Sequence, residues 1–191
     1  MRLFAGIYPP DDVRQHLRRH LAIPGAAARL TLVEKWHITL AFLGEVPPER
    51  LTGMITALGA VPTPCGPGRA PETGPDRGPE AGPDSGFHAG HHAGHHAGHH
   101  AGLELRLSGG GDFHGRVLWA GVRGDLSDLS ADIRRALSLH PEPLRAHLTV
   151  SYTYDEAVAR ALENYEGPPW RLDKIHLIQS ENRTYRTLAT F

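Results

Sequence analysis

The alternation of apolar and polar positions is similar in the two halves of the chain. Each half opens with a short apolar run, at 2–8 and at 116–122, which is typical of a strand. Each run is followed by a segment, 11–22 or 126–138, whose apolar residues stand three and four positions apart. That spacing is typical of an amphipathic helix, so each half is predicted to begin with a strand and a helix.

The likeness continues further along each half. A second strand-like segment, at 36–43 or 146–152, precedes a second helical pattern, at 47–59 or 154–165. The helix at 47–59 has proline in its first turn, where no backbone amide is needed. The order strand, helix, strand, helix therefore occurs twice. Three further strand-like runs complete the predicted sheets, at 103–109, 171–180 and 184–191.

The segment 62–102 differs from everything around it, since it is rich in Pro, Gly and His and has almost no aliphatic residue. Such a segment cannot bury enough apolar area to offset its chain entropy, so we expect a flexible insertion. It separates a first lobe, 1–61, from a second lobe, 103–191, and strands can exchange between the lobes within one compact domain. We predict an α+β fold with two similar lobes, each an antiparallel sheet with flanking helices, related by a pseudo-two-fold axis around a central cleft.

Composition narrows the classes of function. The 191 residues include 20 Lys+Arg and 21 Asp+Glu, a net charge of -1, so any contact with nucleic acid should be local. The one cysteine, Cys65, cannot form an internal disulfide and has no activating neighbour. No apolar run approaches the roughly 20 residues of a membrane span. We expect a cytoplasmic monomer with no membrane contact and no obligate protein partner.

The strand-like segments that follow the first helices carry a His-x-Thr motif each. Because residues two apart in a strand share a face, His37 and Thr39 should project together. The neighbours expected on the opposite, apolar face are Trp36, Ile38, Leu40 and Phe42. In the second motif the alternation places His147, Thr149 and Ser151 on one face. The other face should hold Ala146, Leu148, Val150 and Tyr152.

Two imidazoles and two hydroxyls across a cleft suit the hydrolysis of a strained phosphodiester. Histidine has an ordinary pKa of about 6.5, so it can act as a base or an acid near neutral pH. One histidine would take a proton from the attacking water and the other would protonate the departing ribose oxygen. Thr39 and Thr149 could donate hydrogen bonds to the nonbridging phosphate oxygens. The scheme requires neither a metal nor another cofactor. A single His-x-Thr motif occurs often by chance, and it is the matched pair that favours catalysis.

The chain also resembles a known family, the two-histidine phosphoesterases, and within it the RNA 2′,3′-cyclic phosphodiesterases, historically called 2′-5′ RNA ligases. The stretches that carry the resemblance are RLFAGIYPPDDVRQHL, WHITLAFLGEV, RVLWAGV, AHLTV and LIQSENRTYRTLATF. The resemblance implies conversion of a 2′,3′-cyclic phosphate on an RNA 3′ end or a small cyclic nucleotide to a 2′-phosphomonoester. It implies that His37 is the proton donor and His147 the proton acceptor. RNA 2′-5′ ligation at the same site is the alternative.

The second motif departs from the family pattern, which is Pro-His, a hydrophobic residue, Thr, a hydrophobic residue and then Ala-Arg. The chain reads RAHLTVSY, so Ala146 replaces the proline and Tyr152 the arginine that binds phosphate. Another cation, or Tyr152 and Ser151 through hydrogen bonds, could take its place. Phe113, in the Gly-rich stretch GGGDFHGR that we predict to be a loop, is a further candidate because its ring could stack on a base.

The HHAG repeat in the insertion supports a hypothesis of a different class. Clustered imidazoles bind nickel, zinc or copper, but the glycines disfavour a fixed helix, so we expect weak binding without a defined geometry. The candidate adventitious ligands are His91, His92, His95, His96, His99 and His100. The alternative function is therefore that of a metal-binding protein. The histidines expected to be surface or packing residues are His16, His20, His114, His140 and His176.

Overall fold

A computed structural model describes residues 1–25, 29–62, 102–182 and 184–191. The predicted insertion therefore lies almost wholly outside the described residues, and so do the six histidines of the HHAG repeat. In chain order the elements are β1 (Arg2–Ile7), α1 (Asp11–His20), the 3-10 helix η2 (Val33–Lys35), β2 (Ile38–Glu45), the 3-10 helix η3 (Pro48–Arg50), α2 (Leu51–Gly59), β3 (Glu104–Phe113), β4 (Val117–Arg123), α3 (Ser127–Ala136), β5 (His147–Ser151), α4 (Glu156–Glu163), β6 (Glu166–Arg171), β7 (His176–Glu181) and β8 (Thr184–Thr190).

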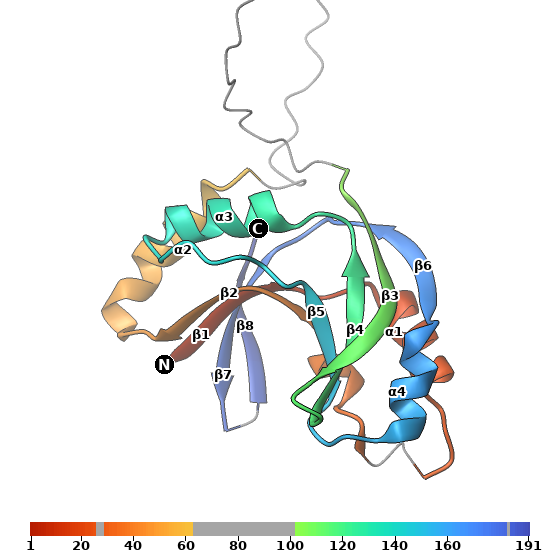
Figure 1. The fold of residues 1–191 in the computed structure, drawn as a ribbon. Coiled ribbons are helices and arrows are strands. Elements are labelled where there is room, and N and C mark those ends of the chain that lie inside the picture. Colours follow the sequence, from red (N-terminus) through yellow and green to blue (C-terminus); the bar gives the residue numbers. More distant parts are fainter. Residues whose placement is uncertain (26–28, 63–101, 183) are drawn as a thin grey trace, which may run out of the picture.

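The strands form a curled antiparallel sheet with flanking helices, which confirms the predicted α+β class (Figure 1). The sheets of the two lobes are joined into one, with the strand order β6-β3-β4-β5-β2-β1-β7-β8. The junction lies between β5 and β2, the strands of the two His-x-Thr motifs. These strands pair at one register position, Ile38 with Leu148, whereas the other neighbouring strands pair over most of their lengths. We call this junction the seam.

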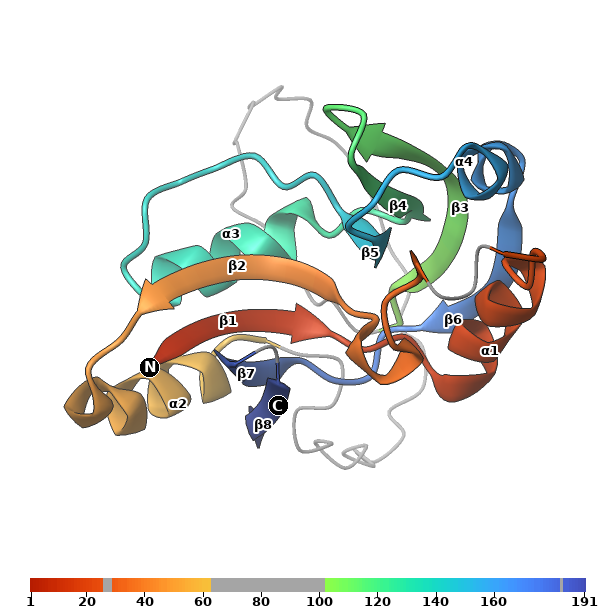
Figure 2. The same cartoon turned by 90° about the horizontal axis from the view of Figure 1, so that it is seen from below.

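Each half of the sheet draws on both ends of the chain. The half β2-β1-β7-β8 combines N-terminal strands with the last two strands, and β6-β3-β4-β5 forms the other half. The helices are distributed in the same way, since α3 packs against β2 while α1 packs against β6 and α4 against β3 (Figures 1 and 2). Each half of the sheet is therefore packed by one helix that is remote from it in sequence, α3 on β2 and α1 on β6.

The strands of the motifs form because each has one thoroughly apolar face. Ile38, Leu40, Leu148 and Val150 are at most 1% exposed and belong to one hydrophobic core beneath the seam. Burying a side chain of this size contributes about 1.5–3 kcal/mol. The core thus fixes which side of each strand turns to solvent, and with it the direction of the polar residues in between.

Two sequence predictions about the remaining strands were wrong in detail. The predicted run 171–180 forms a strand, β7, only from His176, and β6 precedes it at Glu166–Arg171, of which only the last residue lies in the predicted run. β6 holds two prolines, which an edge strand tolerates because its outer amides need no partner. The Gly-rich stretch predicted as a loop continues β3 as far as Phe113. A side chain at Gly111 would lie 2.7 Å from the Trp119 ring, so the glycines allow the strand to pass beneath that indole. Within the described part of the chain, no helix is long and apolar enough to cross a membrane.

Candidate active site

The structure brings the four residues of the two His-x-Thr motifs together at the seam. The antiparallel pairing of Ile38 with Leu148 sets Thr149 opposite His37 and Thr39 opposite His147. All four side chains line one cavity of about 870 Å³. The cavity thus presents each imidazole beside a hydroxyl of its own strand and across from a hydroxyl of the other.

Both imidazoles are oriented by the same backbone contact. Nδ1 of His37 lies 2.6 Å from the carbonyl oxygen of Lys35, and Nδ1 of His147 lies 2.7 Å from that of Arg145. A carbonyl only accepts hydrogen bonds, so each Nδ1 carries the proton and donates it. The other nitrogen, Nε2, is then an acceptor in the neutral ring and a donor in the protonated ring. Each histidine is thereby fixed in the tautomer that allows acid–base chemistry through Nε2.

The residues that supply these carbonyls, Lys35 and Arg145, are both basic. The sequence prediction did not include this repeat. Lys35 also lines the cavity. The Arg145 guanidinium lies over the rings of Phe113 and Trp119, 5.2 and 5.1 Å from their centroids. The signal was present in the sequence as a basic residue two positions before each histidine. Positive charge is therefore available on both sides of the seam.

Aromatic rings surround the two histidines. The ring centroid of His37 lies 4.7 Å from that of Phe4 and 5.2 Å from that of Tyr185. The His147 centroid lies 4.9 Å from that of Phe113 in an edge-on arrangement. Phe113, predicted as a base-stacking residue, is thus a direct neighbour of His147, although it is not among the residues that line the cavity.

Burial and charge alter the protonation of the first histidine. Desolvation lowers the pKa of His37 below its ordinary 6.5; the hydrogen bond to the Lys35 carbonyl opposes this change, and the nearby His147 adds to it. Burial likewise raises the pKa of Tyr185 to about 12, helped by its hydrogen bond with Tyr152. Because its pKa lies below 6.5, His37 is mainly neutral at pH 7 in the free protein.

The predicted faces of three residues near the motifs were wrong. Ser151, expected beside the catalytic face, is fully buried, and its Oγ shares its proton between the carbonyls of Arg29, at 2.8 Å, and Thr153, at 2.7 Å. It is therefore not a substrate contact in this structure. Phe42 and Tyr152, expected on the apolar face, are 65% and 61% exposed and line the cavity. The reason is a β-bulge at Leu40 before Phe42 and one at Val150 before Ser151 and Tyr152, each of which interrupts the alternation on which the prediction rested.

The segment before His37 is fastened to the strand of His147. The amide of Thr31 donates to the carbonyl of Val150 over 2.8 Å, and its Oγ1 is directed at the same carbonyl, 3.1 Å away. The indole Nε1 of the buried Trp36 donates to Thr31 Oγ1 over 2.7 Å. These contacts supplement the one register pair of the seam, so Thr31 links the two motifs directly.

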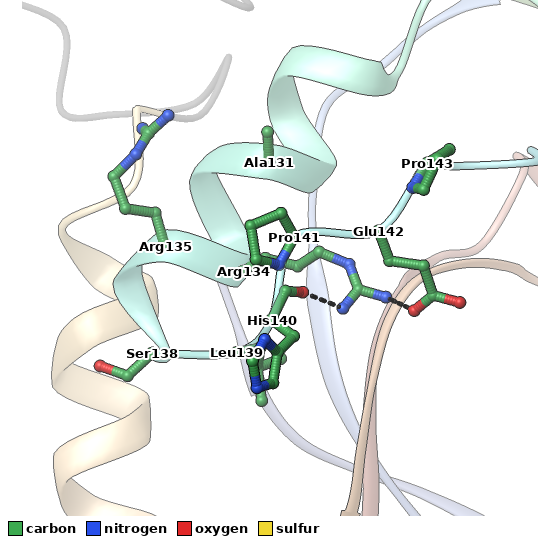
Figure 3. A pocket seen from close by; sticks show the side chains of 9 residues that line it. All are labelled: Ala131, Arg134, Arg135, Ser138, Leu139, His140, Pro141, Glu142 and Pro143. Carbon is green, nitrogen blue, oxygen red and sulfur yellow. Dashed lines mark hydrogen bonds and ion pairs between the residues drawn. The ribbon is translucent and has the colours of Figure 1, made fainter.

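A second cavity, of about 730 Å³, lies at the C-terminal end of α3 (Figure 3). Arg134 crosses it to donate to the carbonyl of His140 over 2.9 Å and to pair with Glu142 (Figure 3). None of the predicted catalytic or substrate-contact residues lines it. The contacts in this second cavity hold the segment after α3 in place. The seam cavity is the candidate active site because it contains both His-x-Thr motifs.

Comparison with known proteins bears on the family and the fold of the chain. Residues 9–184 match a family model described as the 2′-5′ RNA ligase superfamily. The fold is similar to apo E. coli LigT, with a TM-score of 0.66, 21% identity and coverage of 100% of this chain and 95% of that chain. It is also similar to TT0787 of Thermus thermophilus, with a TM-score of 0.66, 20% identity and coverage of 100% of this chain and 97% of that chain. The structure of E. coli LigT complexed with 3′-AMP matches with a TM-score of 0.65, 20% identity and coverage of 100% of this chain and 96% of that chain.

At these identities the structural likeness shows a shared fold. A search among curated proteins finds no match. The family model, in contrast, spans nearly the whole chain and includes both motifs of the seam. The chain therefore belongs to the 2′-5′ RNA ligase superfamily.

Proposed function

We propose that the protein hydrolyses 2′,3′-cyclic phosphates of RNA 3′ ends or nucleotides to 2′-phosphomonoesters, with the two histidines as acid and base. The observation that carries the proposal is the matched orientation of the imidazoles. In both, Nδ1 donates to the carbonyl two residues earlier, which leaves Nε2 for proton transfer. The cavity between them also holds the two threonine hydroxyls.

The reaction balances with these groups alone. Nε2 of neutral His147 takes a proton from water as the water oxygen forms a bond to phosphorus. The bond from phosphorus to the ribose O3′ breaks, and protonated His37 gives its Nε2 proton to that oxygen. Thr39 and Thr149 donate hydrogen bonds to the nonbridging oxygens, which carry the charge in the transition state. Exchange with solvent returns both imidazoles to their starting states. Arg145 and Lys35 provide positive charge close to the site.

The lowered pKa of His37 is compatible with an acid role once substrate is bound. A phosphodiester brings a negative charge into the cavity, and an opposite charge nearby favours the protonated imidazole. Substrate binding should therefore be coupled to proton uptake by His37. The proton is then available in the complex that reacts, while the free protein avoids a buried cation.

The test is hydrolysis of an oligoribonucleotide with a 2′,3′-cyclic phosphate, in the presence of EDTA. We expect the wild type and a variant lacking residues 62–102 to be active, and His37→Ala and His147→Ala each to lose about 10²- to 10⁴-fold in kcat. The product should carry a 2′-phosphate. Normal hydrolysis by both histidine variants would contradict the mechanism, and a 3′-phosphate would contradict the assigned leaving group.

The products and the variants of the same experiment separate the two alternatives. Joining a 2′,3′-cyclic phosphate end to a 5′-hydroxyl end uses the same pair of proton transfers, with the 5′-hydroxyl in place of water as the nucleophile. Ligation would therefore depend on His37 and His147 equally, and would be identified by a 2′-5′-linked product instead of a 2′-phosphate. A function of the HHAG repeat in metal binding would instead be abolished by deletion of residues 62–102 and unaffected by either histidine substitution.

A further inference from the structure

The seam cavity carries positive charge although the chain as a whole does not. Arg2 and Lys35 line it in addition to the two histidines, and none of the described residues that line it is acidic. The whole chain has 20 Lys+Arg and 21 Asp+Glu, with a formal net charge of -1. The cavity therefore concentrates cations and favours an anionic ligand.

Arg2 opens β1, and the register of the sheet determines its neighbours. Its partner on β7 is Ser180, and the partner of Ser180 on β8 is Tyr185. Direct partners in neighbouring strands share a face of the sheet, and all three residues line the seam cavity. They form one row across β1, β7 and β8, which lie side by side (Figure 2). We call Arg2, Ser180 and Tyr185 the polar row.

The polar row lies beyond the His-x-Thr motifs along the strands. Arg2 stands four residues before Gly6, the partner of Thr39, which corresponds to about 13 Å along β1. Aromatic rings fill the space between, since the ring centroid of Tyr185 lies 5.4 Å from that of Phe4 and 5.2 Å from that of His37. One cavity thus contains the two motifs and, at a distance from them, a separate cation.

The side chain of Arg2 is accessible to a ligand. It is exposed, and it forms no hydrogen bond or ion pair with another of the described residues. The acidic residue opposite it on β2, Glu45, has Oε2 3.4 Å from the amino group of Met1. Burial raises the pKa of Tyr185, and the charge of Arg2 opposes this rise, so the guanidinium acts on the end of the cavity that Tyr185 lines.

The donors at this end of the cavity suit a phosphodiester. A guanidinium offers five N–H groups in a planar fork that matches two phosphate oxygens. Ser180 is half-buried and adds a hydroxyl donor, and Asn182, just after β7, adds a side-chain amide. An arginine side chain and one sugar-phosphate repeat together span the distance from the Arg2 backbone to the motifs.

We propose that Arg2, assisted by Ser180, binds the internucleotide phosphodiester on the 5′ side of the terminal nucleoside. The proposal rests on the proposed function, which places the cyclic phosphate between His37 and His147. The protein then selects polymeric RNA ends over cyclic mononucleotides. Because the contact is made to a phosphate, the selection is independent of base sequence.

The experiment compares three substrates with the same terminal 2′,3′-cyclic phosphate. They are a nucleoside, a dinucleotide, and the same dinucleotide with an uncharged methylphosphonate as its internucleotide linkage. On the normal dinucleotide, Arg2→Gln should lower kcat/KM by about 5- to 20-fold, a modest loss for a charged hydrogen bond because Arg2 is exposed. On the other two substrates it should match the wild type. Arg2→Lys keeps the charge without the planar fork and should lose less than Arg2→Gln.

Arg186→Gln is the matched control. Arg186 follows Tyr185 in β8 and is also exposed, but it points to the opposite face of the sheet and does not line the cavity. This variant should behave as the wild type on all three substrates. Because Arg2 is exposed, its variants should fold normally, which thermal melting verifies. Equal losses of Arg2→Gln on the three substrates, or a loss on the dinucleotide no larger than that of Arg186→Gln, would overturn the proposal.

A binding measurement separates this proposal from the proposed function. The dissociation constant of a dinucleotide with a 2′-phosphate requires no hydrolysis, and its logarithm should rise with the logarithm of the salt concentration. In Arg2→Gln this slope should fall by about 0.7, the value for one phosphate contact to a single strand, and in Arg186→Gln it should be unchanged. An unchanged slope in Arg2→Gln would overturn the phosphate subsite. If the slope falls while the wild type hydrolyses no cyclic phosphate, the subsite is supported and the catalytic proposal alone is wrong.

Discussion

The two half-sites share a pattern of backbone contacts but differ in their surroundings. Each histidine follows a basic residue whose carbonyl orients it, and each precedes a bulge at the same distance. Yet His37 lies among the rings of Phe4, Tyr8 and Tyr185, where desolvation lowers its pKa. The hydrogen bond of His147 is exposed, and Arg145 lies above the rings beside it. A repeated framework can thus supply two identical groups, while their neighbours make them suitable for different tasks.

The largest expected effect comes from changing the leaving group. With a p-nitrophenyl phosphodiester, whose leaving group departs without a proton, we expect His37→Ala to recover most of a loss of about 10²-fold or more. His147→Ala should stay impaired, because water still has to be deprotonated. Steady-state rates on the cyclic phosphate and the nitrophenyl ester give the comparison. If His147→Ala recovered and His37→Ala did not, the result would show that His147 is the acid and His37 the base.

A smaller effect should follow from loosening the seam. Thr31→Val removes the hydroxyl that links Trp36 to the strand of His147, and misplacement of reacting groups by about 1 Å can cost up to 10²-fold. We expect kcat to fall by about tenfold with little change in KM, and Thr31→Ser to restore it. Thr56→Val is the control, since Thr56 makes a similar hydroxyl contact on exposed α2. A wild-type kcat in Thr31→Val would show that the register pair and the backbone hydrogen bond of Thr31 suffice to align the motifs.

The pH dependence of anion binding should sharpen the contrast between the histidines. Burial holds the pKa of His37 below 6.5, and a bound anion raises it, so binding takes up a proton. The affinity for sulfate, whose charge is constant near neutrality, should therefore be several-fold higher at about pH 5.5 than at about pH 8. Isothermal titration calorimetry at the two pH values measures the dissociation constant of sulfate.

In His37→Gln the dependence of sulfate affinity on pH should shrink. In His176→Gln it should persist, because the pKa of His176 is also lowered by burial but this residue does not line the cavity. An unchanged dependence in His37→Gln would show that His37 is not coupled to the anion.

The smallest effect on catalysis is expected at the first bulge. Ser130→Ala leaves the buried carbonyl of Leu40 without its hydroxyl partner, which should lower the free energy of unfolding by about 1–3 kcal/mol. Catalysis on a cyclic mononucleotide should change less than in Thr31→Val, because Ser130 does not connect the two motifs. Chemical denaturation and kcat together measure this. A larger loss of kcat than in Thr31→Val would contradict the different roles given to the two hydroxyls.

Periodicity determined which segments form strands and helices, because burial of one apolar face dominates the local choice. It failed where a bulge interrupts the alternation, and so misplaced Ser151, Phe42 and Tyr152. It also failed at β6, where an edge position allows two prolines in a strand. These outcomes depend on the partner strands, which the local pattern does not contain.

The sequence by itself determined the pair of His-x-Thr motifs and their place in two similar halves. The tertiary structure decided that β2 and β5 meet at one register pair, that Thr31 fastens them, and that α1 and α3 support opposite halves of the sheet. It also decided that the pKa of His37 is lowered, since the rings that bury this histidine come from β1 and β8. The sequence identifies the candidate reactive groups, but their orientation and solvation depend on contacts between residues far apart in the chain.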